Sequence, residues 1–291
     1  MKIEKPIFIV GSGRSGTTIL YNLLSQHPEV CWFSNITDRF TMFPQAAALH
    51  RLLDLPYLGN WLKHRNIAGL NKLRFRIRPA EAERIYHSFC GLEKARKTTE
   101  EDYSEKTAQR LKRIINAHIL MTGKSRFLIK QTANNQRIRL MNRMFPDAFV
   151  VHIIRDGRAV ANSLFMVNWW NDVDIWWLGC KPPQWNNPGK DPIELCALQW
   201  KRDVNEILNN RHLYESRYIE VRYEDLVQDV HKIINVITDF CNLRRSNEFR
   251  LLLPKTLPDM NWKWKKNFTV RQKKAVEGAI GEFQMQIGYE P

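Results

Sequence analysis

A glycine-rich stretch near the N-terminus, VGSGRSGTT at residues 10–18, has the composition of a phosphate-binding loop. It follows the apolar run PIFIV and precedes a helical pattern, which predicts strand, tight turn and helix start. Main-chain N–H groups at such a turn, with the positive end of the helix dipole, bind anions. In the pattern G-x-x-x-x-G-K-[ST], Gly11 and Gly16 match and Thr18 takes the hydroxyl position, but Thr17 replaces the lysine.

Arg14, inside the same loop, supplies a positive charge in place of that lysine. A guanidinium stays ionised at every relevant pH, and its planar fork matches a tetrahedral oxyanion. The absent lysine argues against tight binding of a nucleoside triphosphate with magnesium. A phosphate joined to a second anionic group, neutralised without a metal, fits the loop better. The alternative is a structural turn that leaves Arg14 in solvent.

A second group of residues lies in VVHIIRDGRAVANSLF, at 150–165. The pattern predicts a buried strand that ends at Ile154, with Arg155 emerging at its carboxyl end. A helix that begins at about Arg158 then carries Ser163 one to two turns along. An arginine at a strand end and a helix hydroxyl can together bind another phosphate. Alternatively, Arg155 pairs with a neighbouring acid and Ser163 is a surface hydroxyl.

Together the two segments resemble the sulfotransferase family that uses 3′-phosphoadenosine 5′-phosphosulfate (PAPS) as donor. GSGRSGTT resembles the family's 5′-phosphosulfate loop, and RDGRAVANS resembles its 3′-phosphate element. The arginine loop followed by LLSQHPEV is more similar to the tyrosylprotein and bacterial branches, since the cytosolic phenol and steroid branch usually has lysine at the position of Arg14. The resemblance implies transfer of a sulfonate group from PAPS to an acceptor hydroxyl or amine, leaving 3′,5′-ADP.

Three weaker similarities follow along the chain: LIKQT at 128–132, RYEDLVQD at 222–229, and KWKKNFT at 263–269 with the terminal IGYEP. They resemble a strand-end lysine motif, a segment whose tyrosine lies near the adenine, and a closing basic segment. The residues that the resemblance places against the donor are Gly13, Arg14, Ser15, Gly16, Thr17, Thr18, Arg155, Ser163, Tyr223 and Lys265.

Catalysis of this transfer requires stabilisation of the charge that builds on the bridging oxygen and on the sulfonate. Arg14, the loop N–H groups and the hydroxyls of Thr17 and Thr18 suit this task. Lys130, at a predicted strand end, is the second catalytic candidate. The alternative is a structural ion pair, because Gln131 and Thr132 depart from the family's usual residues after this lysine.

The general base is not evident from the sequence. In the tyrosylprotein branch a glutamate follows the first helix, and the corresponding residue here is Asn35. Asp38 is the nearest acid and is the candidate base, although a capping or surface role fits it equally well. A base must lie within hydrogen-bond reach of the acceptor. Asp172 and Asp174 are weaker candidates, and His27 fits better as a helix-end residue.

The segment VNWWNDVDIWWLGCKPPQW, residues 167–185, holds five of the ten tryptophans and follows the Arg155–Ser163 element. Indole faces stack on sugars, aromatic rings and lipids, so the segment is a candidate acceptor site. The alternative is a lid that packs on the core. The acceptor class stays open: a small molecule, a glycan, a lipid or a peptide tyrosine.

The elements that must position these residues form an α/β pattern. Four apolar runs, at 6–10, 126–130, 148–154 and 217–221, lack alternation and predict strands buried on both faces. Helical patterns separate them, including 192–209 and 269–287. We therefore predict a P-loop-like open parallel β-sheet flanked by helices, with ligands beyond the carboxyl ends of the strands. One domain, 1–291, would carry a mostly helical insertion at about 37–122.

Composition restricts the ligands and the setting. The 45 Lys and Arg against 30 Asp and Glu give a formal charge of +15, which favours anionic ligands. The five scattered cysteines predict buried free thiols and no metal site. No apolar run reaches the ~18–20 residues of a membrane span, and MKIEKPIFIVG leaves no room for a secretory signal. We expect a cytoplasmic protein.

Two other functions compete with sulfonate transfer. One is a P-loop kinase or nucleotide hydrolase, which would need the missing lysine and a magnesium-binding acid at a strand end. The other is a non-catalytic module that binds polyanions through the positive charge. No nucleic-acid-binding signature is visible in the sequence, so nucleic acid is not an expected partner.

Overall fold

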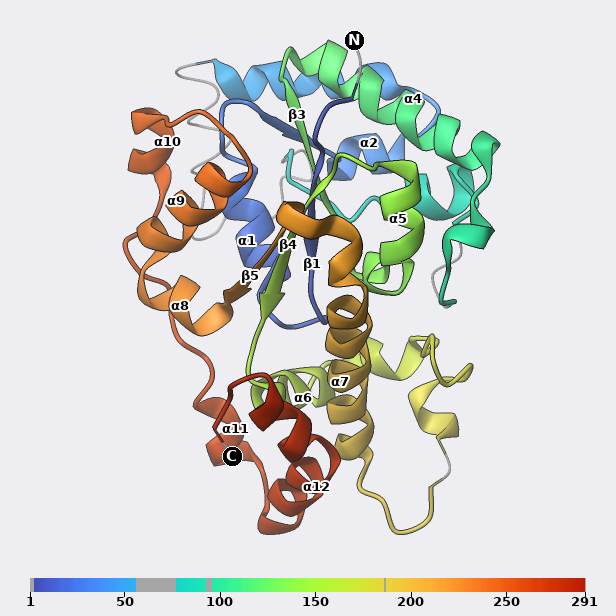
Figure 1. Ribbon diagram of the computed structural model, residues 1–291, viewed down its shortest axis with the longest axis vertical. Coiled ribbons are helices and arrows are strands. Elements are labelled where there is room, and N and C mark those ends of the chain that lie inside the picture. The colour runs from blue at the N-terminus through green and yellow to red at the C-terminus, as the bar shows by residue number, and fades with distance from the viewer. Residues whose placement is uncertain (1–2, 56–76, 93–95, 186, 291) are drawn as a thin grey trace.

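The computed structural model describes residues 3–55, 77–92, 96–185 and 187–290. A five-stranded parallel sheet lies at its centre, with strand order β2-β3-β1-β4-β5. Figure 1 shows helices on both faces of this sheet. The open parallel α/β sheet expected from the sequence is confirmed. The strands are β1 (Ile7–Val10), β2 (Val30–Trp32), β3 (Arg126–Lys130), β4 (Phe149–Ile154) and β5 (Tyr218–Arg222).

Both faces of the central strands are buried, as their unbroken apolar sequences predict. Ile7 and Ile9 of β1 belong to a core on one face, and Phe8 belongs to the core on the other. The edge strand β2 was not predicted from the sequence. With only three residues, VCW, it is too short to give a periodic signal.

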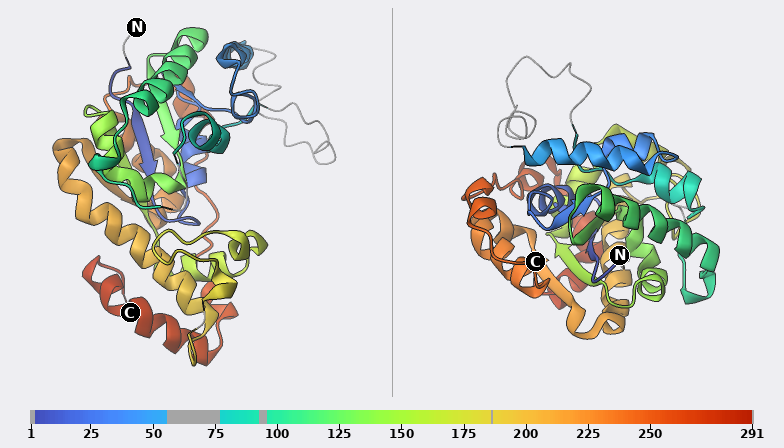
Figure 2. Two further views of the ribbon diagram at one scale, coloured as in Figure 1. Left: turned by 90° about the vertical axis from the view of Figure 1, so that its right-hand side faces the viewer. Right: turned by 90° about the horizontal axis from the view of Figure 1, so that it is seen from above.

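Three cores position the helices. One face of the sheet packs against α1 (Thr17–Leu24), α8 (Tyr223–Gln228), α9 (Val230–Phe240) and α10 (Asn247–Leu252). The other face packs against α4 (Glu105–Thr122) and α5 (Ile138–Met144). The third core lies among α6 (Gly157–Phe165), α7 (Pro192–Asn210) and α12 (Val270–Gln286). In Figure 1 and in the left view of Figure 2, α12 lies at the end of the molecule opposite α4, and α7 runs toward it. The remaining helical elements are α2 (Asn35–Arg39), α11 (Lys263–Asn267), η1 (Pro44–Asp54), η2 (Ile85–Phe89), η3 (Glu100–Asp102), η4 (Thr132–Arg137), η5 (Asn168–Asp172), η6 (Pro182–Gln184) and η7 (Arg211–Arg217).

The two long helices predicted near the C-terminus are confirmed. Pro192 opens α7 behind an Asp191 cap, and Thr269 caps α12 by accepting a hydrogen bond from the N–H of Gln272 at 3.2 Å. Within the predicted insertion, the described residues are mainly helical, while residues 56–76 and 93–95 lie outside the described part. The division into one domain with an insertion stays a prediction.

Buried histidines make the folded state sensitive to acid. Burial lowers the pKa of His50 to about 3, of His118 to about 4 and of His152 to about 3, from an ordinary value of 6.5. Below that value the unfolded chain takes up protons that the folded chain does not. For each pH unit below 6.5, each of these histidines lowers the free energy of unfolding by about 1.4 kcal/mol. Burial also raises the pKa of Asp203 to about 6, which partly opposes the effect between about pH 4 and 6.

We therefore expect the free energy of unfolding to be about 4–5 kcal/mol lower at pH 5 than at pH 7. Urea unfolding at the two pH values measures this difference. The His152→Asn variant keeps a nitrogen or oxygen atom near Tyr218 Oη, which lies 2.7 Å from His152 Nδ1. It should reduce the pH dependence by about 2 kcal/mol. If the wild type is equally stable at the two pH values, the lowered pKa values of these histidines are contradicted.

Candidate functional site

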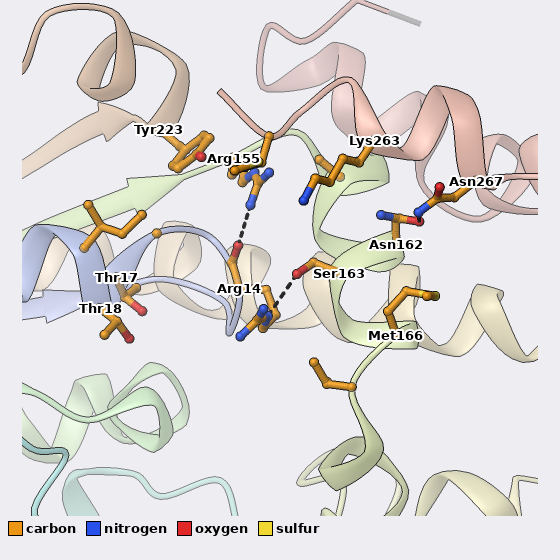
Figure 3. Close-up of a pocket in the computed structure, with 15 residues that line it drawn as sticks. Arg14, Thr17, Thr18, Arg155, Asn162, Ser163, Met166, Tyr223, Lys263 and Asn267 are labelled. Atoms are coloured by element: carbon orange, nitrogen blue, oxygen red, sulfur yellow. Dashed lines mark hydrogen bonds between the residues drawn. The ribbon is translucent and has the colours of Figure 1, made fainter. Parts of the chain in front are cut away.

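A cavity of about 480 Å³ lies where the central strands end, and the two main sequence motifs meet there (Figure 3). Its walls come from the glycine-rich loop, from the end of β4 with α6, from Tyr223 at the end of β5, and from the C-terminal segment. The polar and charged lining residues are Arg14, Thr17, Thr18, Arg155, Asn162, Ser163, Tyr223, Lys263 and Asn267.

The glycine-rich loop has the backbone of a tight anion-binding turn. Gly11 and Gly16 have φ angles of 149° and 93°, and Arg14 also lies in the left-handed region at 72°. Gly16 caps α1 without a side-chain hydrogen bond, so the first-turn N–H groups are available to an anion. Asn135 fixes the start of the loop, with its amide bonded to Gly11 N and O at 3.0 and 2.8 Å.

Arg14 joins the loop to α6. Its Nε donates to Ser163 Oγ at 2.9 Å, and its carbonyl oxygen accepts from Arg155 Nη1 at 3.0 Å (Figure 3). Residues that are 141 and 149 positions apart in sequence thus line one cavity. Two guanidinium groups held this way form a strongly anion-attracting site.

Arg155 is buried and is linked to the carboxylate of Glu224 through the neutral side chain of Asn261. Its Nε donates to Asn261 Oδ1 at 2.7 Å, and Asn261 Nδ2 donates to Glu224 Oε1 at 2.6 Å. The guanidinium lies 4.2 Å from the centre of the Tyr223 ring. Burial lowers the pKa of Arg155, but from so high a value that the group stays ionised. Within the described part of the chain, Arg155 forms no direct ion pair, so the predicted alternative of pairing with an acid is not found.

Tyr223 also explains why residue 16 is glycine. A Cβ atom on Gly16 would lie 2.6 Å from Tyr223 Cδ2, and the φ of 93° disfavours any side chain. Gly16→Ala should therefore lower the free energy of unfolding by about 2 kcal/mol. Gly278→Ala in α12, where an added Cβ meets no atom within 4 Å, is the matched control and should stabilise the protein by ~0.5 kcal/mol. Urea unfolding tests both, and equal effects would contradict this role of Gly16.

Lys130 is buried at the end of β3, as predicted, but it has a partner that the sequence did not reveal. It forms an ion pair with Glu81 and donates to Thr18 Oγ1 at 3.3 Å. Glu81 Oε2 also accepts from the N–H and hydroxyl of Thr132 at 3.2 and 3.0 Å. The ion pair foreseen as the alternative for Lys130 is therefore present, and it lies beside the glycine-rich loop.

Asp38, the candidate base, caps a helical segment. Its Oδ1 accepts hydrogen bonds from the N–H groups of Arg84 and Ile85 at 2.9 and 3.2 Å. Burial raises the pKa of Asp38, and these two N–H groups oppose the rise. The structure thus shows the capping role that the sequence left open, and a role for Asp38 as base stays a prediction. Asp172 and Asp174 are exposed.

Three residues predicted to contact the donor, Gly13, Ser15 and Lys265, do not line the cavity. Lys263, two residues before the expected Lys265, lines the cavity and points into it (Figure 3). Lys265 is not among the lining residues, and its ammonium lies 5.8 Å from the centre of the Trp264 ring. Gly13 and Ser15 belong to the loop turn without lining the cavity. Their contacts with a donor stay predictions.

Two asparagines in the cavity wall were missed by sequence reasoning. Asn267 Nδ2 donates to Asn162 Oδ1 at 3.1 Å, which ties the C-terminal segment to α6 (Figure 3). Asn162 directly precedes Ser163 and Asn267 belongs to KWKKNFT, so both lie in motifs already identified. An amide carries no local signal that separates a ligand contact from a structural one.

The tryptophan-rich segment packs mainly on the protein itself. Trp176 Nε1 donates to Asp203 Oδ1 at 3.0 Å, and Trp177 Nε1 donates to Gln199 Oε1 at 2.8 Å. Asp203 in turn accepts from Ser12 Oγ at 3.0 Å, which links the segment to the glycine-rich loop. Of the five tryptophans, only Trp169 is exposed, at 49%. Lid packing accounts for the segment better than a stacking platform does.

Among the described residues, no three His, Cys, Asp or Glu side chains gather as a metal site. In that same part of the chain, the helices are all too short or too polar to cross a bilayer. The cysteines are free, and four are buried, with Cys180 half-buried.

Comparison with known proteins agrees with this geometry. No curated protein matches the sequence. Sulfotransferase STF9 from Mycobacterium avium matches with a TM-score of 0.60 and 16% identity, over 100% of this chain and 78% of that one. STF1 from Mycobacterium tuberculosis H37Rv matches with a TM-score of 0.60 and 17% identity, over 97% and 76%. The sulfotransferase domain of the Synechococcus PCC 7002 olefin synthase matches with a TM-score of 0.52 and 21% identity, over 100% and 97%.

At these identities, the solved structures show a shared fold. The family is shown by a model of the sulfotransferase family, which matches residues 6–247 of this sequence. The matched range includes the glycine-rich loop, Lys130, Arg155 and Ser163. The membership expected from the PAPS-type motifs is thereby confirmed: the chain belongs to the sulfotransferase family, enzymes that transfer sulfonate groups.

Proposed function

We propose that this sulfotransferase binds PAPS in the cavity of Figure 3 and transfers its sulfonate group to an acceptor hydroxyl or amine, leaving 3′,5′-ADP. The observation that carries the proposal is the contact of Arg14 with both Ser163 and Arg155. This contact brings together the two segments that resemble the family's 5′-phosphosulfate loop and 3′-phosphate element. A donor with anionic groups at both its 3′ and 5′ ends needs this arrangement.

The residues present suit such a ligand in charge and size. Arg14, Arg155 and Lys263 bring three cations to the cavity, which balances a nucleotide with several negative charges. A volume of about 480 Å³ is in the range of small-molecule sites. Arg14 with Thr17 and Thr18 would hold the 5′ group. Arg155 and Ser163 would hold the 3′-phosphate, with Tyr223 beside them.

PAPS, when bound, supplies an activated sulfonate on a phosphate leaving group. The protein's part is to hold it and to offset charge as it shifts toward that phosphate. Arg14 and the loop N–H groups lie at the 5′ end of the proposed site. Lys130, through its contact with Thr18, would add a second cation there. Neither group requires a metal ion.

The acceptor is proposed only by class, as a hydroxyl or amine on a small molecule, a glycan or a lipid. Incubation with ³⁵S-labelled PAPS and a metabolite extract from the source should label one acceptor class. Calorimetry in EDTA should show binding of 3′,5′-ADP, with ATP binding more weakly. Binding of ATP that requires magnesium, with none of 3′,5′-ADP, would overturn the proposal. Salt-sensitive binding of anionic polymers alone would overturn it as well.

A further inference from the structure

The carboxylate of Glu81 lies beside the ammonium of Lys130, which contacts the hydroxyl of Thr18 in the glycine-rich loop. Its Oε1 pairs with the buried ammonium of Lys130, which also contacts Thr18, a residue of the donor cavity. Its Oε2 is held by the N–H and hydroxyl of Thr132. The side chain of Glu81 is 36% exposed while that of Lys130 is 3% exposed. The side chain of Glu81 is thus more open to solvent than that of its partner Lys130.

The segment that carries Glu81 is fixed by Asn35, the residue that stands where the tyrosylprotein branch has glutamate. Asn35 N donates to Arg78 O at 3.1 Å, and Arg78 N donates to Asn35 Oδ1 at 2.9 Å. Two residues further on, Ala80 N donates to Phe33 O at 2.9 Å. The first contact uses the main chain of Asn35 and the second uses its side-chain oxygen, so together they hold Arg78 against the start of α2. Asn35 therefore builds the support for a carboxylate that comes from elsewhere in the chain.

Two further features orient Glu81 toward Lys130. Gln131 Nε2 donates to the carbonyl oxygen of Glu81 at 3.1 Å, which ties the segment to the end of β3. Ala82, the next residue, is buried and has a φ of 56°. A non-glycine residue in this left-handed region is uncommon, and such residues are held in place by their surroundings, often at functional sites. The backbone thus turns sharply right after the carboxylate.

We propose that Glu81 is the general base of the transfer reaction, an assignment that rests on the proposed function. Glu81 takes the proton of the acceptor hydroxyl as the acceptor oxygen forms its bond to sulfur. The bond from sulfur to the bridging oxygen of the donor breaks, and its electron pair stays on the phosphate. Lys130 and Arg14 offset that charge. The proton then passes from Glu81 to solvent, which restores the enzyme.

Lys130 links proton removal by Glu81 to charge stabilisation at the donor. Burial alone would raise the pKa of Glu81, but the ammonium of Lys130 and the hydrogen bonds from Thr132 lower it on balance. Glu81 is therefore ionised and ready to accept a proton at neutral pH. When Lys130 turns toward negative charge at the donor loop, its hold on Glu81 weakens, and the carboxylate becomes the stronger base. Asp38 lacks such a coupling, because its contacts are with the backbone.

The test uses Glu81→Gln, which keeps the size of the side chain and one acceptor oxygen, for Lys130 or for Thr132, but cannot take the proton. With the acceptor found by ³⁵S labelling, its kcat should fall ~10²–10⁴-fold. Calorimetry should show 3′,5′-ADP bound as tightly as by the wild type or more tightly, because a negative charge near the ligand is removed. Glu83→Gln, at an exposed glutamate two residues along, is the matched control and should keep full turnover.

Two readouts separate a base from a structural partner of Lys130. Turnover of the wild type should fall on the acid side of its pH profile, and this limb should vanish in Glu81→Gln. Added formate should restore part of the rate of Glu81→Ala. Unchanged turnover of Glu81→Gln, or a loss of 3′,5′-ADP binding that matches the loss of turnover, would overturn the assignment. A wild type that neither binds 3′,5′-ADP nor transfers sulfonate would instead overturn the proposed function.

Discussion

Replacing Arg14 by alanine is expected to lower kcat for sulfonate transfer by ~10²–10³-fold, the cost of removing one preorganised charge-stabilising donor. Arg14 is exposed and reaches Ser163 across the cavity, so the core loses little when its side chain is removed. The hydrogen bond from Arg155 to the carbonyl oxygen of residue 14 involves the backbone and survives. Steady-state turnover with ³⁵S-labelled PAPS measures the effect, and thermal unfolding checks the fold.

Arg14→Lys serves as the matched comparison. It keeps the positive charge but loses the planar fork and the Nε that donates to Ser163. We expect its turnover to lie between those of the wild type and Arg14→Ala. If Arg14→Ala turns over like the wild type, the guanidinium has no part in charge stabilisation and the loop binds its anion through backbone groups alone.

Replacing Arg155 by alanine should act mainly on binding and weaken the affinity for 3′,5′-ADP by ~10–100-fold, as expected for one or two charge-assisted hydrogen bonds. The proposed partner of Arg155 is the 3′-phosphate, which takes no part in bond breaking. For this reason kcat at saturating PAPS should fall less than it does for Arg14→Ala. Calorimetry with 3′,5′-ADP and with 5′-AMP tests the assignment, since the variant should lose its preference for the 3′-phosphate.

The control for this variant is Arg245→Ala, which removes an exposed arginine paired with Asp239 and should leave nucleotide binding unchanged. Arg155 also supports the loop and Asn261, so the melting temperature of Arg155→Ala must be compared with that of the wild type. An equal loss of affinity for 3′,5′-ADP and 5′-AMP would show that Arg155 shapes the loop and does not contact the 3′-phosphate.

Three functions were compatible with the sequence alone, and the family match distinguishes between them. Membership of the sulfotransferase family favours sulfonate transfer over a P-loop kinase or hydrolase and over a non-catalytic polyanion-binding module. The replacement of the phosphate-loop lysine by Thr17, with Arg14 nearby, had already pointed the same way. Which acceptor receives the sulfonate depends on contacts that the loop motif does not encode.

The sequence alone predicted the features that depend on one element at a time, namely strands and the residues at their ends. Burial on both faces leaves an unbroken apolar run, which predicted β1, β3 and β4, and the ends of β3 and β4 fix where Lys130 and Arg155 emerge. The run at 217–221 also predicted a strand, but β5 is an edge strand in which only Val221 is buried. Parallel strands end at one edge of the sheet, which was enough to predict that ligands bind beyond those strand ends. The hydrogen bond from Arg155 Nη1 to the carbonyl oxygen of Arg14, at 3.0 Å, joins the two predicted motifs there.

Only the tertiary structure decided which side chains meet across long stretches of chain. Glu81 and Lys130 are 49 residues apart, and nothing in the composition or periodicity around Glu81 distinguishes it from the exposed Glu83. Asp38 was nearer in sequence to the expected position of the base, yet its carboxylate is taken up by backbone N–H groups. Periodicity reports burial along one element, whereas a pair such as Glu81 and Lys130 depends on how separate elements dock.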